Sequence, residues 1–517
     1  MAVRLKVVVS LWMVAVAAGT ACAQNAPQFH LALPPGPHAV GLKVVEQYDA
    51  SRSYLPLTDA VGKPTQGERA RPLQTLIWYP GETSKGTPMK LGDYVALIAT
   101  ATSFGKPVAT SDDWLKESLA KVAGEPMWAV RDAPAAPGRF PVVIYAPSFG
   151  SNSWENVDLC EYLASQGYVV IASTALGAAG RAMTADLAGV GAQARDLSFL
   201  IGFARSLPDA DLSKVAVGGF SWGGLANLFA AAQDNRIDAL FALDGSMRYF
   251  PGLVKDAGYI HPEQMTVPLI YFTEGEIPME ELDPAQASKL ETGPSVLNEW
   301  KHGDLITAHM LGMTHGEFCS INQRDEGFWK NFAKNEKADY GREDGIPGYA
   351  WMANYLAHFL DAYLKGDATA MAWLKKTPAE NGAPKHLMSV SFREAKGVAP
   401  TLEAFRAEVG RRGFEHAAEI NSAIRKDNPD FKLEEQTLED WGERLISENH
   451  LPEAIAILAF NVSLYADASD AYQHLGGAYA KAGEKQLAID NYHKALDKNP
   501  GNEEAKKRLA ELEKPAS

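Results

Sequence analysis

Short apolar runs alternate with amphipathic stretches along residues 40–365, as in a chain of strands separated by helices. Runs of strand length occupy 42–48, 73–79, 141–146, 168–172, 215–218, 239–243, 268–272 and 305–310. Helical stretches, for example 156–166 and 192–206, separate most of them. The run at 141–146 has no charged or hydrogen-bonding position except a tyrosine, which is typical of a strand buried on both faces. The pattern predicts an α/β fold class with a mostly parallel, doubly wound sheet.

Two segments depart from this alternation. Residues 89–130 lie between two predicted strands and are long for a connection, so we expect a lid insertion there. Residues 376–400 contain several prolines and glycines and are expected to form a linker. Because 517 residues exceed what one core usually holds, we expect two domains, at 24–375 and 401–517.

The region after residue 400 is predicted to be helical and carries an internal repeat of 34 residues. The better-defined repeat matches the tetratricopeptide pattern at Tyr472, Leu475, Gly476, Tyr479, Gly483, Ala488, Tyr492, Ala495 and Pro500. One period earlier, much of the pattern returns at Leu438, Trp441, Gly442, Leu445, Ala454 and Leu458. We expect two tetratricopeptide repeats, at about 435–468 and 469–502, with a helix pair at 402–426 before them and a closing helix at 503–513.

The N-terminus has the pattern of a secretory signal peptide. Arg4 and Lys6 precede an apolar run over 7–18, and small residues follow it, which predicts cleavage after Ala23. We therefore expect an exported protein, periplasmic or secreted, with residues 1–23 removed. Lipid attachment through Cys22 is the alternative, although Gly19 stands where a lipoprotein signal usually has an aliphatic residue.

Composition narrows the function classes. The net charge of −15 argues against a nucleic-acid partner, which would require a basic face. No cysteine or histidine cluster has the spacing of metal ligands, so neither a metal nor a cofactor is expected. After signal cleavage only Cys160 and Cys319 remain, and the sequence leaves open whether they pair.

The clearest chemical motif is Gly219-Phe220-Ser221-Trp222-Gly223. It lies between a β-branched run at 214–218 and a helical stretch at 225–233, which is the context of a nucleophile elbow. In such a turn the serine occupies a strained conformation, and side chains two residues away on either side would collide with neighbouring elements. The motif predicts that Ser221 is a catalytic nucleophile.

A serine nucleophile needs a histidine base and an acid that orients it, and after this elbow they follow in the order acid, then histidine. His315 lies in a loop just past the strand at 305–310, at the carboxyl edge where such sites assemble. The other histidines between Ser221 and residue 400 lie in less suitable places: His261, His302, His309, His358 and His386. For the acid we favour Asp244, which follows the strand at 239–243. Glu274 and Glu276, after the next strand, remain alternatives.

An oxyanion hole requires two backbone N–H donors. The residue after the nucleophile, Trp222, is expected to supply one, and the loop after the strand ending at Ala146 the other, with Phe149 as the best candidate. The aromatic side chains of Phe149, Trp154 and Trp222 would make the acyl pocket apolar, which suits esters better than charged peptides.

These residues resemble the platelet-activating-factor acetylhydrolase and dienelactone-hydrolase-like branch of the α/β-hydrolases. The resemblance covers about residues 40–365 and rests on Ile77-Trp78-Tyr79-Pro80, the elbow, Leu243-Asp244-Gly245 and Thr314-His315-Gly316. It implies an α/β-hydrolase fold, with the acid after the strand that follows the elbow helix, which is the position of Asp244. Two features depart from the group: Pro147-Ser148 replaces its usual His-Gly, and Phe220 replaces a histidine. Dienelactone hydrolases proper use a cysteine nucleophile, so Ser221 argues against that activity.

The sequence therefore predicts an exported serine esterase that cleaves a small-molecule ester with Ser221, His315 and Asp244. A serine peptidase or amidase on the same fold is one alternative. Another is a non-catalytic scaffold whose tetratricopeptide repeats bind a protein partner in a concave groove.

Overall fold

The computed structural model describes residues 29–59, 61–82, 85–107, 113–274, 296–325 and 342–514. The predicted signal peptide at 1–23, Cys22 and Glu276 lie outside the described residues.

The described residues form one large sheet whose strands are mostly parallel, as the sequence predicts. The strands are β1 (Ala39–Ser53), β2 (Ala70–Gly81), β3 (Pro88–Lys90), β4 (Pro126–Arg131), β5 (Phe140–Ala146), β6 (Val169–Ser173), β7 (Ala210–Phe220), β8 (Ala239–Leu243), β9 (Leu269–Glu274), β10 (Leu305–Met310) and β11 (Ser389–Arg393). Their order is β11-β10-β9-β8-β7-β5-β6-β2-β1-β4-β3. The pairs from β6 through β5, β7, β8 and β9 to β10 are parallel. Antiparallel pairs flank them, between β1 and β2, β2 and β6, and β10 and β11.

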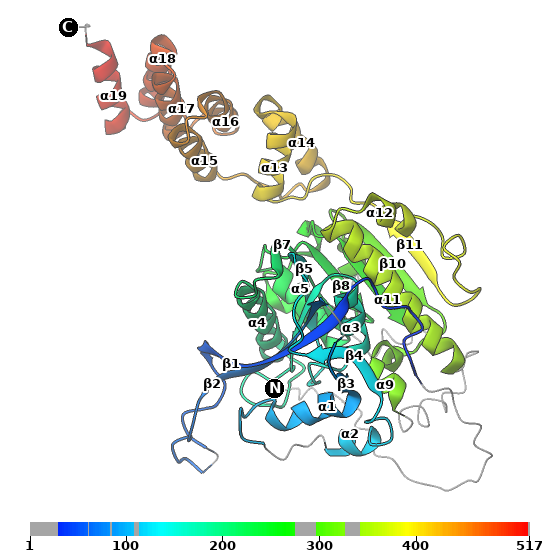
Figure 1. Cartoon of the computed structure of the whole chain (residues 1–517). Coiled ribbons are helices and arrows are strands. Elements are labelled where there is room, and N and C mark those ends of the chain that lie inside the picture. The colour runs from blue at the N-terminus through cyan, green and yellow to red at the C-terminus, as the bar shows by residue number, and fades with distance from the viewer. Residues whose placement is uncertain are drawn as a thin grey trace, which may run out of the picture.

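Helices cover both faces of this sheet (Figure 1). The helices of the α/β part are α1 (Leu91–Ala96), α2 (Asp113–Ser118), α3 (Val157–Ser165), α4 (Leu187–Ala204), α5 (Trp222–Ala231), α6 (Pro251–Ala257), α8 (Val296–Glu299), α9 (Ser320–Arg324), α11 (Arg342–Leu364) and α12 (Ala368–Leu374). Short 3-10 turns accompany them at η1 (Leu97–Thr100), η2 (Ser246–Arg248), η3 (Pro262–Gln264) and η4 (His315–Phe318).

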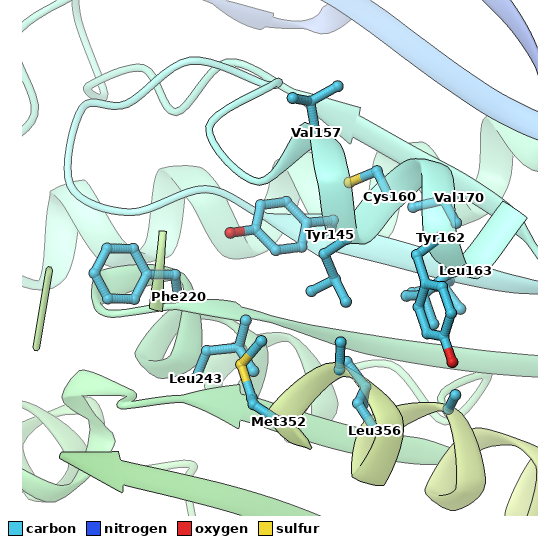
Figure 2. Packing of buried hydrophobic residues seen from close by; sticks show 14 of the residues in the cluster. Tyr145, Val157, Cys160, Tyr162, Leu163, Val170, Phe220, Leu243, Met352 and Leu356 are labelled. Atoms are coloured by element: carbon cyan, nitrogen blue, oxygen red, sulfur yellow. The ribbon is translucent and has the colours of Figure 1, made fainter. Parts of the chain in front are cut away.

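Alternating side chains of the central strands supply two separate cores. On β5, Val143 and Tyr145 join the core beneath α3 and α11, whereas Val142 and Ile144 join the core beneath α4 and α5. Figure 2 shows residues of the first core, among them Tyr145 of β5, Cys160 of α3 and Met352 of α11. Burial on both faces explains why these strands read as unbroken apolar runs in the sequence.

The expectation of a lid insertion at 89–130 is wrong for the end of that segment. Residues 126–130 belong to β4, which pairs in parallel with β1 through Val40 and Ala129 and so extends the sheet. Nearby, the Trp78 indole donates to the Tyr94 hydroxyl at 3.0 Å, which fixes α1 against β2. Met127 and Ala129 are buried and the intervening Trp128 is partly exposed, and this alternation is the signal for a strand here.

The expectation of a linker at 376–400 is wrong in its second half. β11 pairs with β10 through residues 389–393, and the Ala395 N–H donates to the Asp304 carboxylate at 2.7 Å. Val398, by contrast, packs in the helical core that follows. An edge strand buries only one face, so Val390 and Phe392 are its only apolar positions and the pattern is weak. The α/β part therefore extends to about residue 397.

The C-terminal region is helical, and Figure 1 shows its helices stacked one after another beyond the sheet. They are α13 (Leu402–Arg412), η5 (Phe414–His416), α14 (Ala417–Asp427), α15 (Glu435–Ser447), α16 (Leu451–Leu464), α17 (Ser469–Lys481), α18 (Lys485–Lys498) and α19 (Glu503–Glu513). No helix within the described ranges is long and apolar enough to cross a bilayer.

Two close helix contacts recur in this region at the period of the sequence repeat. A Cβ on Gly442 of α15 would lie 2.5 Å from the Leu458 side chain of α16. A Cβ on Gly476 of α17 would lie 3.1 Å from the Tyr492 ring of α18. In both hairpins a glycine on the first helix therefore admits a large side chain from the second.

Candidate active site

Ser221 occupies the sharp turn between β7 and α5. Its φ of 53° and ψ of −116° lie in a region that side-chain-bearing residues rarely adopt. Backbone hydrogen bonds hold this conformation: Ser221 N donates to Leu243 O at 3.0 Å, and Ser221 O accepts from Gly224 and Ser246. The surrounding strands and turns thus maintain a strained backbone at the carboxyl edge of the sheet.

The two motif glycines meet the same backbone atom. A Cβ on Gly219 would lie 1.8 Å from the carbonyl oxygen of Ala146, and a Cβ on Gly223 would lie 2.0 Å from it. Ala146 ends β5, the strand beside β7, so the turn can pack this closely only without side chains at 219 and 223. The structure supplies the steric reason that the motif implies.

His315 begins η4, in the loop that follows β10. Its Nε2 lies 3.0 Å from the Ser221 hydroxyl oxygen, within hydrogen-bond distance. Glu317 caps this turn by accepting from the Thr314 N–H at 2.6 Å, and the Phe220 ring lies 4.9 Å from the imidazole. The side chain is 43% exposed, so the serine–histidine pair is open to solutes.

Asp244 is fully buried and faces the other side of the imidazole. Its Oδ2 lies 2.5 Å from His315 Nδ1. Its Oδ1 accepts from the Tyr249 hydroxyl at 3.1 Å, the Thr273 hydroxyl at 3.2 Å and the Glu274 N–H at 3.3 Å. These donors fix the carboxylate and satisfy it away from water.

Asp244 and Glu274 are the described carboxylates that the sequence leaves open as the acid. Asp244 lies at hydrogen-bond distance from the imidazole ring. Glu274 Oε2 accepts instead from the backbone N–H of His315, at 2.7 Å. The geometry therefore favours Asp244 as the partner of the imidazole.

The charges around His315 favour its protonated form. Removal of water from around the ring lowers the pKa of His315, but the hydrogen bond and charge of Asp244, followed by the charges of Glu274 and Glu155, outweigh that effect and raise the pKa above its usual value. Such an imidazole is a stronger proton acceptor than one in water.

The loop after β5 is held by a buried glutamate, Glu155, that belongs to no recognisable sequence motif. Glu155 accepts from the Ser148 N–H at 2.8 Å and from the Ser148 hydroxyl at 2.6 Å, and also from the Tyr145 hydroxyl at 2.8 Å. Burial raises the pKa of Glu155, while these hydrogen bonds act in the opposite direction. Because Ser148 N is used in this way, Phe149 remains the candidate donor within this loop.

Aromatic rings line the site beside the serine. The exposed Phe149 ring packs edge-on against Trp222 with centroids 5.3 Å apart, and Trp222 packs edge-on against Phe250 at 5.4 Å. Trp154 is buried in the core beneath α3 and does not join this group.

The remaining candidates do not join this site. Each of the other histidines named above lies on a different element: His302 bonds to Lys396 O, His358 stacks on Trp373, His261 precedes η3, His309 is in β10 and His386 is in a loop. Cys160 and Cys319 are separate buried thiols. Within the ranges that the structure describes, no group of three His, Cys, Asp or Glu side chains could hold a metal ion.

A hydroxyl, an imidazole and a buried carboxylate in one hydrogen-bonded line can deprotonate the hydroxyl as it attacks an electrophile. The imidazole accepts the proton, and the carboxylate fixes its tautomer and stabilises the resulting cation.

A protein-family sequence model and a solved structure are among those that are similar to this chain. The sequence model of the dienelactone hydrolase family matches residues 127–276, a segment that contains Ser221 and Asp244 and ends before His315. A solved structure described as "Ferulic acid esterase from Streptomyces cinnamoneus" is similar at 21% identity and a TM-score of 0.47, over 70% of this chain and 99% of that chain. A search of curated proteins gave no match. Over residues 127–276 the chain is thus similar to dienelactone hydrolases.

Proposed function

We propose that this chain is a serine hydrolase that cleaves carboxylic esters of small molecules through a covalent acyl-enzyme. The observation that carries the proposal is the line from Asp244 through His315 to Ser221, with contacts of 2.5 and 3.0 Å. The family match over 127–276 supports a hydrolase. The position of Asp244, after the strand that follows the elbow helix, supports the acetylhydrolase-like branch.

In the proposed reaction Ser221 Oγ attacks the ester carbonyl while His315 Nε2 takes the hydroxyl proton. The N–H groups of Trp222 and Phe149 stabilise the oxyanion, and Trp222 has the advantage of lying at the first position of α5, where helix N–H groups are unpaired. The tetrahedral intermediate then collapses, and His315 passes its proton to the departing alcohol. A water molecule, deprotonated by His315, releases the acid by the same steps in reverse.

The apolar edge formed by Phe149, Trp222 and Phe250 supports esters over charged peptides. A peptidase or amidase would use the same three polar side chains as an esterase. The two activities must therefore be distinguished by testing substrates, because the geometry of the three side chains fits both. Strained backbone such as that of Ser221 costs free energy and is found mostly at functional sites, where the surrounding fold maintains it. A non-catalytic scaffold would gain nothing from a strained serine aligned with a histidine.

A matched series of substrates tests this proposal. We expect p-nitrophenyl acetate and butyrate to be hydrolysed, and the p-nitroanilides of the same acids to react on the order of 100-fold more slowly. We also expect a fluorophosphonate to label the protein at Ser221, with loss of fluoride. Faster turnover of the anilides would favour an amidase, and neither turnover nor labelling would favour the scaffold.

We further propose that the C-terminal helices are tetratricopeptide repeats that bind a protein partner or pack on the hydrolase domain. The recurring glycine contacts at 442 and 476, one sequence period apart, support this. Export, to the periplasm or outside the cell, is proposed from the pattern of residues 1–23 alone.

Truncation distinguishes the two domains. A chain ending at Gly397 keeps β11 and the three proposed catalytic residues, so we expect it to hydrolyse p-nitrophenyl acetate within about 3-fold of the full chain, by analogy with surface changes remote from a site. A chain ending at Lys376 exposes the β10 edge and should unfold at a lower temperature. The measurements are kcat/KM and Tm for both. A folded 397-residue chain without turnover would show that the helical region completes the active site.

A further inference from the structure

Glu274, the last residue of β9, is connected to the site by both its backbone and its side chain. Its N–H donates to Asp244 Oδ1 at 3.3 Å, and its Oε2 accepts from His315 N at 2.7 Å. One residue thus contacts the buried acid on one side and the backbone of the histidine on the other. From the sequence alone, Glu274 is only an alternative to Asp244 as the acid.

The contact with His315 meets a specific need of that loop. His315 is the first residue of η4, and N–H groups at the start of a helical turn have no partner within the turn. Asp244 and Ser221 contact only the ring of His315, so they do not fix its backbone. Glu274 fixes the backbone directly, through a charge-assisted hydrogen bond.

We propose that Glu274 is a positioning residue for the esterase reaction, and that its carboxylate holds the His315 backbone so that the imidazole reaches both Ser221 and Asp244. This inference rests on the proposed function. Glu274 does not contact the reacting atoms, and its effect passes through His315.

The negative charge of Glu274 adds a second, separable effect. The charged groups that face His315 are Asp244 after β8, Glu274 on β9 and Glu155 before α3, and all three raise the pKa of His315. Because the neutral imidazole is the base, activity rises as the pH passes upward through this pKa. Removing one of the three charges must therefore move the acid limb of the pH profile to lower pH.

Two substitutions separate the hydrogen bond from the charge. The amide oxygen in Glu274→Gln can still accept from His315 N, but it carries no charge, whereas Glu274→Ala removes both the bond and the charge. Glu263→Ala is the matched control. Glu263 is a half-exposed glutamate on η3 that pairs with the preceding His261, away from the catalytic line.

We expect Glu274→Ala to lower kcat for p-nitrophenyl acetate by about 10²-fold with little change in KM, because a shift of about 1 Å in a catalytic group costs about that much. Glu274→Gln should lose no more than about 5-fold and should move the acid limb of kcat/KM to lower pH. Glu263→Ala should match the wild type in rate and in pH profile. The measurements are kcat, KM, the pH profile and Tm for each full-length variant.

The outcomes are distinct. A residue with only a structural role would lower Tm without moving the acid limb in Glu274→Gln, and that result would overturn the proposal. So would an active Glu274→Ala, or a Glu274→Gln as impaired as the alanine variant. A wild type with neither ester turnover nor fluorophosphonate labelling would refute the proposed function first, and this role with it.

Discussion

Replacing Ser221 by alanine is expected to lower kcat/KM for p-nitrophenyl esters by at least about 10³-fold. The reason is that removing one member of a catalytic triad abolishes nearly all of the rate enhancement that the three residues provide as a unit. Labelling by a fluorophosphonate should disappear, since the reagent forms its bond to the serine oxygen. The substitution removes one oxygen from a turn held by backbone hydrogen bonds, so Tm should change little. Initial rates, labelling followed by mass spectrometry, and thermal unfolding provide the three measurements.

Ser213→Ala is a suitable control for this experiment. Ser213 is an exposed serine on the same strand, and its hydroxyl bonds to Asp211. Its replacement should leave both labelling and turnover intact. Undiminished labelling of the Ser221→Ala variant would place the nucleophile elsewhere.

The second large effect is expected at Asp244. Its Oδ1 accepts from three donors, so in Asp244→Asn the amide oxygen should take that position and the NH₂ group should face His315 Nδ1. Nδ1 must then act as an acceptor, and Nε2 carries the proton. An imidazole in this tautomer cannot accept the Ser221 proton, and we expect kcat to fall by about 10⁴-fold.

KM should change little in this variant, because Asp244 is fully buried and does not contact solute. Thermal unfolding separates a catalytic loss from a loss of folding. Near-normal turnover in Asp244→Asn, together with a large loss in Glu274→Gln, would transfer the role of the acid to Glu274. It would leave the assignments of Ser221 and His315 unchanged.

The sequence indicates the elbow and His315 because each depends on local order: a strand, a turn and a helix around Ser221, and a loop at the carboxyl end of a strand before His315. It favours Asp244 as the acid but leaves Glu274 open, since both follow neighbouring strands at one edge of the sheet. In the structure the two carboxylates differ in position. Asp244 has a left-handed backbone, with a φ of 44°, and its buried carboxylate contacts the imidazole.

Other features depend on contacts between residues far apart in the chain. The side chain of Glu155 accepts from Ser148, only seven residues earlier in the chain. Its backbone oxygen accepts from the N–H of Ile321, 166 positions further on, and no local sequence pattern could indicate that contact. β11 is an edge strand with a weak pattern. β4 does show an apolar alternation, but it lies at the end of a long segment whose length alone suggests an insertion.

The carbonyl of Ala146, which faces both Gly219 and Gly223, has a consequence for engineering. The turn that carries Ser221, the proposed nucleophile, packs against the last residue of β5, which precedes the loop that begins at Pro147. If the proposed esterase reaction holds, we expect that loop residues such as Phe149 can be varied to select different acyl groups without moving Ser221. A change at Ala146 itself would shift the turn that carries Ser221 and so lower the rate for every substrate alike. A library of variants aimed at new selectivity should therefore begin at residue 149 and leave residue 146 constant.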